Sequence, residues 1–295
     1  MAQKTLYYVP LQETTECVLL RRPSCENKSP YVADVNKNGT IHLAHVPSLN
    51  LSGKCVPGTI CLMKYATDKK GTKIGPNCTT SKYGKRKCEF HSFLVLYKHI
   101  WIAAHPKIGE TIASHLLKPG TIYTSISESE IIRCQAEVAG VAGTNMRVDY
   151  LLTHKDNTST MVEVKTVVDC EDDNPSSCLD TGGAIFPFGK RTQKYDGNKV
   201  VSERAIKHVS ELTLVSKKIK VDTQYPILNT CMLFIVVRDD CQYFKPHKEA
   251  CPTFAAVLHT AKVNGVLLVA HKVGWEIHNE QILCKDRGEI PVLLP

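Results

Sequence analysis

Short segments in which apolar and polar residues alternate dominate the first third of the chain. Period-two alternation predicts β-strands, because successive side chains of a strand point to opposite faces. The segments are ECVLLRR, PYVADVN, TIHLAHV, GTICLMKYA and FHSFLVLYKHIWIAA. Turn signals separate them at Lys37-Asn38-Gly39, Ser52-Gly53 and Pro57-Gly58. Closely spaced strands of this number predict a small barrel or sandwich, and an OB-type barrel fits the count.

From about residue 106 the apolar residues follow a helical period instead. PKIGETIASHLLKPG, SERAIKHVSELTLVSKK and CPTFAAVLHTAKVNG predict helices, the second with Ser202 as its N-cap. CMLFIVVR and VLLVAHKV are short apolar runs typical of buried strands. The polar stretch 169–199 predicts mainly loop. We expect an α/β (α+β) protein, with a barrel domain over 1–97 and a domain with a central sheet and flanking helices over 98–295.

Residues 147–165, RVDYLLTHKDNTSTMVEVK, predict a β-hairpin that carries charge on an apolar background. If the hairpin turns around Asp156 and Asn157, residue 149 lies opposite residue 163. Asp149, Glu163 and Lys165 then share one face of the sheet. Paired acids repel each other unless something neutralises them.

A divalent metal would neutralise these acids, and carboxylate oxygens suit Mg²⁺ or Mn²⁺. Asp149 and Glu163 are therefore candidate metal ligands, and Lys165 a candidate catalytic residue that would stabilise charge on a phosphate. This set predicts phosphodiester hydrolysis. The alternative is a surface strand on which Asp149 pairs with Lys165 in a structural salt bridge. The apolar strands favour a buried sheet, where bare charges are costly.

The net charge of +8 lies in the first third of the chain: residues 1–98 carry +9 and the rest −1. This asymmetry indicates a surface for a polyanion, nucleic acid first and an anionic membrane second. A Lys- and Gly-rich segment near 68–89 predicts a mobile basic loop. Its candidate phosphate contacts surround Tyr83 and are Lys82, Lys85, Arg86 and Lys87. A loop that only aids solubility is the alternative.

Thirteen cysteines and no apolar leader segment predict reduced thiols in a soluble, unexported protein of the cytoplasm or nucleus. The sequence contains no run of 18 consecutive apolar residues, so no membrane-spanning segment is predicted. The spacing of Cys55, Cys61, Cys78, Cys88 and His91 fits no usual zinc pattern.

Several blocks in order resemble the sugar fermentation stimulation protein A (SfsA) family. They are RVDYLL…VEVKTV, SERAIKHVSEL and FIVVRDDCQYFKP…CPTFAAVL…NGVLLVA, with ENKSPYVADVN and IHLAHVPS…VPGTICLM upstream. The resemblance covers most of the chain and is strongest over 145–270. A helical block of that family is matched by Ser202, Arg204, Lys207, His208, Glu211 and Leu212.

The resemblance implies an N-terminal OB-like domain followed by a restriction-endonuclease-like domain of PD-(D/E)XK type, in a DNA-binding protein. It assigns Asp149 and Glu163 as acidic metal ligands for Mg²⁺ (or Mn²⁺) and Lys165 as the catalytic lysine. Arg204, Lys207 and His208 become candidate nucleic-acid contacts. The chain departs from the family pattern where Phe188 replaces an acid near the site.

The expected function is therefore DNA binding, largely independent of base sequence, with a metal-dependent nuclease site. The expected partner is DNA, with neither a membrane nor a small-molecule cofactor. A non-catalytic DNA-binding or regulatory protein that keeps the nuclease fold is the runner-up. A scaffold whose basic loop binds a protein partner is the third alternative.

Overall fold

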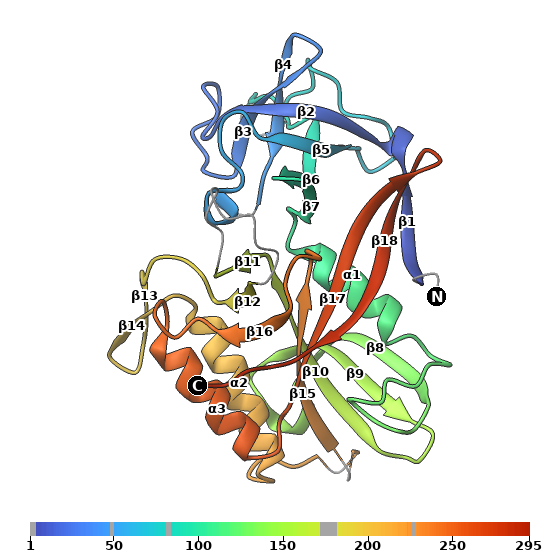
Figure 1. The fold of residues 1–295 in the computed structure, drawn as a ribbon, viewed down its shortest axis with the longest axis vertical. Coiled ribbons are helices and arrows are strands. Elements are labelled where there is room, and N and C mark those ends of the chain that lie inside the picture. Colours follow the sequence, from blue (N-terminus) through green and yellow to red (C-terminus); the bar gives the residue numbers. More distant parts are fainter. Residues whose placement is uncertain (1–3, 48–49, 81–83, 172–181, 223, 226–227) are drawn as a thin grey trace. The chain divides into compact units, whose positions relative to one another are not determined.

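The computed structural model describes residues 4–47, 50–80, 84–171, 182–222, 224–225 and 228–295 (Figure 1). The chain divides into two compact units. Unit 1 comprises Met1–Ile108, Val237–Asp239 and Val273–Asp286, and unit 2 comprises Gly109–Val236, Asp240–Lys272 and Arg287–Pro295. The expected domain boundary at 97/98 stays a prediction. Unit 1 is not one continuous stretch of sequence, because it also includes two later segments.

Five strands of unit 1 form a closed barrel, which confirms the barrel expected from the sequence. Around the ring the order is β4-β3-β2-β5-β6, and a parallel pairing of β4 with β6 closes it. Their bounds are β2 Thr14–Arg21, β3 Val32–Lys37, β4 Thr40–His45, β5 Ile60–Tyr65 and β6 Phe90–Tyr97. A short strand, β7 (Ile100–Ala103), continues from β6 as a hairpin. Alternating side chains such as Leu19, Val35 and Leu94 fill the core, and each is fully buried.

Unit 1 also contains a strand pair that the sequence analysis did not predict. β1 (Thr5–Pro10) pairs antiparallel with β18 (Gln281–Ile290), from the other end of the chain. In the same unit Trp275, on β17 (Leu267–His278), packs edge-on against Tyr7 of β1 and Phe93 of β6.

A mixed sheet forms the centre of unit 2, and it confirms the mixed α/β class. Over the described residues the sheet has seven strands, and the five that begin in unit 2 lie in the order β17-β15-β10-β9-β8. β10 (Ser159–Val167) and β15 (Leu228–Val236) pair in parallel, as do β15 and β17, whereas β8 (Ile131–Ala139), β9 (Arg147–His154) and β10 pair antiparallel. Strand β8 was not predicted.

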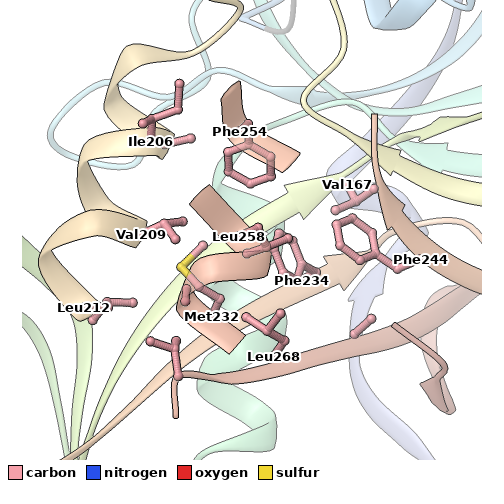
Figure 2. Packing of buried hydrophobic residues seen from close by; sticks show 14 of the residues in the cluster. Val167, Ile206, Val209, Leu212, Met232, Phe234, Phe244, Phe254, Leu258 and Leu268 are labelled. Carbon is pink, nitrogen blue, oxygen red and sulfur yellow. The ribbon is translucent and has the colours of Figure 1, made fainter. Parts of the chain in front are cut away.

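The core of unit 2 lies between this sheet and the helices α2 (Glu203–Ser216) and α3 (Pro252–Val263) (Figure 2). Val209 and Leu212 of α2 and Leu258 of α3 point toward Met232 and Phe234 of β15, and all five are fully buried. As predicted, Ser202 caps α2: its hydroxyl accepts a hydrogen bond from the Ala205 amide at 3.2 Å. Because α2 packs against the sheet along this stripe, its polar face is fixed relative to β10.

The remaining elements are short. α1 (Lys107–Leu116) follows the barrel, and β11 (Asp169–Cys170), β12 (Gly183–Phe186) and β16 (Tyr243–Pro246) form a small sheet. β13 (Gln193–Tyr195) and β14 (Asn198–Val200) form a hairpin. The polar stretch 169–199 thus includes short strands where loop was expected.

The described residues contain no group of three or more His, Cys, Asp or Glu side chains placed to hold a metal, so no zinc cluster forms among them. Within the same ranges no helix is long and apolar enough to cross a membrane.

Candidate metal-binding and catalytic site

The β9–β10 hairpin has the register predicted from the sequence. Tyr150 pairs with Val162 and Leu152 with Thr160, and the chain turns at Asp156 and Asn157, where Asn157 adopts a positive φ of 64°. One step beyond the last of these pairs, Asp149 faces the Glu163 position. Its Oδ2 accepts a hydrogen bond from the Val164 amide at 2.7 Å.

Glu163 is the most deeply buried charged side chain of this site, at 1% exposure. Its Oε1 accepts hydrogen bonds from Lys165 Nζ and from His208 Nδ1, the latter at 2.5 Å. Its Oε2 is buried and has no hydrogen-bond partner among the described residues. The surface-strand alternative is therefore wrong: the strand is buried, and Lys165 pairs with Glu163 instead of Asp149.

The two carboxyl groups have opposite pKa shifts. Burial, the Glu163 charge and the Glu110 charge raise the pKa of Asp149 to about 6, against the lowering effect of the Val164 amide and Lys165. Burial also acts to raise the pKa of Glu163. The hydrogen bond from His208 and the charges of Lys165 and His208 outweigh it, so the net pKa is lowered. Glu163 is thus held as a carboxylate, while Asp149 resists ionisation beside it.

His208 links Glu163 to the polar face of α2. Arg204, one turn earlier on the helix, donates from Nε to His208 Nε2 at 3.5 Å. A carboxylate oxygen can only accept, so Nδ1 of His208 is the donor in the bond to Glu163 Oε1. This bond orients the carboxylate and directs Oε1, not Oε2, toward the protein donors.

Two residues of the site were not predicted from the sequence, and both lie in the first turn of α1. Glu110 acts on Asp149 through its charge. Its backbone carbonyl accepts a hydrogen bond from Tyr150 Oη at 2.8 Å, which ties α1 to β9. Gly109 lets the helix approach β10, because a Cβ there would lie 2.1 Å from Thr166 Oγ1. The glycine before the acid in KIGE is the one local signal of such close packing.

The donor set suits a hard divalent cation. Two carboxylates, one with an unpartnered buried oxygen, are the ligands that Mg²⁺ takes, since it keeps several waters and binds through one or two carboxylates. Asp149 and Glu163 are the residues that would hold it.

A groove of about 750 Å³ borders this site in unit 2. Its lining includes Tyr195, Arg204, Lys207, His208 and Glu211. Lys207 is 59% exposed and pairs with Glu203 at 2.7 Å, and Glu211 pairs with Lys220 at 2.5 Å. The structure thus gathers the predicted contacts Arg204, Lys207 and His208 along one helix face beside Glu163.

The predicted basic loop joins β5 to β6. Lys85 and Lys87 are exposed, whereas Lys82 lies outside the described residues. Arg86 donates to Glu26 at 2.8 Å and to the buried Glu89 at 2.7 Å. Its guanidinium therefore fastens the loop to the barrel, and the candidate phosphate contacts that project outward are Lys85 and Lys87.

The fold and site together define a mixed α/β protein in which a five-stranded barrel precedes a unit with a buried acid–lysine site. Residues 199–279 match the family model "Sugar fermentation stimulation protein RE domain". The chain is similar to the sugar fermentation stimulation (SfsA) proteins, and the family-model match lies mostly within its second unit. The matched residues include Arg204, Lys207 and His208, while Asp149, Glu163 and Lys165 precede them.

Curated relatives and a solved structure agree with this assignment. A sugar fermentation stimulation protein homologue of Thermosynechococcus vestitus is 24% identical and covers 94% of each chain. A homologue from Methanosphaera stadtmanae is also 24% identical, over 85% of each chain. The structure of Pyrococcus furiosus SfsA in complex with Ca²⁺ has a TM-score of 0.69 and 18% identity, and it covers 99% of this chain and 100% of its own. At that identity the likeness shows the fold.

Proposed function

We propose that this protein is a DNA-binding phosphodiesterase with a divalent-metal site at Asp149 and Glu163. One observation carries the proposal: a buried carboxylate, Glu163, keeps one oxygen unpartnered beside a second carboxyl group and a lysine. An unsatisfied buried oxygen is costly, and it is found where a ligand completes the site. A hairpin with an acid on one strand and Glu-x-Lys on the next is the arrangement of the PD-(D/E)XK nucleases, to which we assign unit 2.

A family model and a solved structure support this assignment. The matching family model is described as an RE domain, and the Pyrococcus furiosus protein was solved with Ca²⁺. Ca²⁺ and Mg²⁺ are both hard cations that prefer oxygen ligands. A cation of this class therefore fits the two carboxylates better than a soft metal, and Mg²⁺ or Mn²⁺ is the proposed cofactor.

Each side chain has a distinct role in the proposed reaction. Asp149 and Glu163 would hold the cation, whose chemistry there would be to polarise a phosphate and acidify a bound water. Lys165 Nζ, now paired with Glu163, steadies the attacking oxygen or the charge that develops on the phosphate. His208 positions the Glu163 carboxylate through the bond from Nδ1.

DNA binding rests on the basic barrel and on the groove beside α2. Residues 1–98 carry +9, and Lys85 and Lys87 project from the barrel loop. Contacts of this kind grip phosphates without reading bases, so affinity should fall steeply with salt. Arg204 and Lys207 would meet the backbone next to the scissile phosphate.

A non-catalytic DNA-binding protein is the second candidate. It is favoured by the Lys165–Glu163 ion pair, which neutralises one of the two acids without a metal. On that alternative the hairpin is a structural relic, and the barrel performs the function.

The deciding experiment compares wild type with Glu163→Gln, Lys165→Met and the control Glu137→Gln, an exposed acid of β8. Each is incubated with labelled single- and double-stranded DNA in EDTA, Mg²⁺ or Mn²⁺, and binding and cleavage are read from the same samples. Metal-dependent cleavage that both site variants lose, with binding retained, establishes the nuclease. Equal binding without cleavage under any metal establishes the second candidate.

A further inference from the structure

Three basic side chains form a row across the barrel of unit 1. The strand registers place Lys64 of β5 opposite His91 of β6, and His91 opposite His45 of β4. Directly paired residues project from the same face of a sheet. The rings of His91 and His45 meet edge to face with centroids 5.6 Å apart.

Two further basic residues approach this row from the segment after β7. His105 is close enough for its pKa to respond to Lys64, His45, His91 and Lys107. Its Nδ1 accepts a hydrogen bond from the Lys107 amide at 3.3 Å. The acid that acts on Lys64 is Glu13, at the end of the 3-10 turn Leu11–Glu13.

Burial and crowding favour the neutral form of the histidines in this cluster. Burial, then its basic neighbours, lowers the pKa of His105 to about 4, and burial lowers the pKa of His45 and His91 as well. Burial also lowers the pKa of Lys64, whose Nζ lies 4.5 Å from the centre of the Phe93 ring. The cluster therefore combines a lysine with three imidazoles that burial favours in the neutral form.

Neutral histidines suit metals, but the geometry here does not. The described residues hold no group of three such ligands at metal-binding distances, and two lysines would repel a cation. An anion, in contrast, is attracted to this cluster. It accepts hydrogen bonds from the lysine ammonium and stabilises the protonated form of each imidazole.

We propose that Lys64, His91 and His45, with His105 at the edge, form a binding site for a phosphate group on the barrel. His91 is the most exposed of the four side chains and supplies the entry side, while Lys64 is half-buried and supplies the fixed charge. The group comes from a nucleic-acid backbone or from a free phosphate, and both present the same oxygens. The site lies in unit 1 and needs neither the metal nor the acids of unit 2.

Binding at this site must take up protons. The histidines are neutral when the site is empty at pH 8, and the phosphate raises their pKa, so affinity increases as the pH falls toward 6. Calorimetry in buffers of different ionisation enthalpy measures that uptake directly.

The test titrates the full-length protein, in EDTA, with inorganic phosphate and separately with a short oligothymidylate, at pH 6 and pH 8. The variants are Lys64→Met, which keeps the apolar stem, and His91→Gln. His99→Gln, an exposed histidine between β6 and β7, is the control. We expect at least one ligand to bind wild type and the control, more tightly at pH 6, and both site variants to weaken it by about tenfold.

Each outcome of the titrations leads to a defined conclusion about the site. Binding of both ligands, or of the oligothymidylate alone, assigns the site to backbone phosphates, and binding of inorganic phosphate alone assigns it to a small anion. Unchanged affinity in Lys64→Met and His91→Gln, or no pH dependence, overturns the proposal. Because Glu163→Gln leaves these residues intact, its phosphate binding should equal that of wild type, whatever becomes of the nuclease activity.

Discussion

His208 of α2 and Glu163 of β10 meet side chain to side chain, with Nδ1 of the imidazole 2.5 Å from Oε1 of the carboxylate. The bond joins a helix to a strand and leaves Oε2 unpartnered. The groups around Glu163 therefore bind one of its carboxylate oxygens, and the other is the oxygen that the proposed cation would contact.

Replacing His208 should weaken metal binding without abolishing it. His208→Phe removes the donor that orients Glu163, and loss of such a partner typically lowers metal affinity about 10- to 100-fold. His208→Gln can still donate an N–H and should recover most of the affinity. Mn²⁺ titration followed by calorimetry measures both, with His259→Phe, an exposed histidine of α3, as the control. Equal affinity in His208→Phe and wild type would contradict the positioning role.

Metal should stabilise the fold through the same two acids. At a Mn²⁺ concentration about 100-fold above Kd, linkage predicts about 2.7 kcal/mol of added stability for a site present in the folded state alone. Asp149→Asn should lose that gain. In EDTA the same variant should be at least as stable as wild type, because it removes the charge that opposes Glu163. Thermal unfolding with and without Mn²⁺ checks both statements, and a full Mn²⁺ effect in Asp149→Asn would exclude this carboxyl group as a ligand.

Gly109 should tolerate no side chain. A Cβ there would lie 2.1 Å from Thr166 Oγ1 and 3.3 Å from Thr166 Cα, so Gly109→Ala forces α1 away from β10. Overpacking of this kind costs about 1–3 kcal/mol. Thr166→Ala in the same chain should recover part of the loss. Gly75→Ala is the matched control, because its Cβ would meet nothing within 4 Å. Denaturant unfolding of these three variants and the wild type decides whether the close approach holds α1 in place.

Much of the hairpin was predictable because its determinants are local. Alternation along 147–165 assigns the faces, and the Asp156-Asn157 turn fixes the register, so Asp149, Glu163 and Lys165 could be placed together from sequence. The strands of the barrel were predictable for the same reason.

The rest depends on contacts between distant residues. β1 and its partner β18 are separated by almost the whole length of the sequence, and no local pattern encodes that pairing. β8 was missed because its side chains are mostly exposed, so its apolar periodicity is weak. His208 could be named as a site residue from the resemblance. Its bond to Glu163, 45 residues away, depends on how α2 packs against the sheet.

Arg86 and Lys87 should behave differently although they are adjacent. Arg86 bridges Glu26 and the buried Glu89, so Arg86→Ala leaves a buried carboxylate short of a donor and should cost about 1–3 kcal/mol of stability. Lys87→Ala removes an exposed charge and should change stability by less than about 0.5 kcal/mol. If Lys87 contacts phosphate, its loss should reduce the salt slope of DNA binding by about one. Denaturant unfolding and binding across a salt series separate the two effects, and a destabilised Lys87→Ala would contradict the assignment.

Protonation of His105 should lower the free energy of unfolding in mild acid. Its pKa is about 4 in the folded chain and about 6.5 when unfolded, so the unfolded state binds more protons between these values. The contribution of neutral His105 to the free energy of unfolding is complete above pH 6.5 and is lost as the pH falls toward 4. Between pH 7.5 and pH 5 wild type should lose about 1 to 2 kcal/mol more than His105→Gln, which does not titrate. Gln can still accept from the Lys107 amide, so the comparison isolates the proton. Urea unfolding at the two pH values measures the difference, and parallel pH profiles for the two proteins would show that burial and the basic neighbours do not hold His105 neutral.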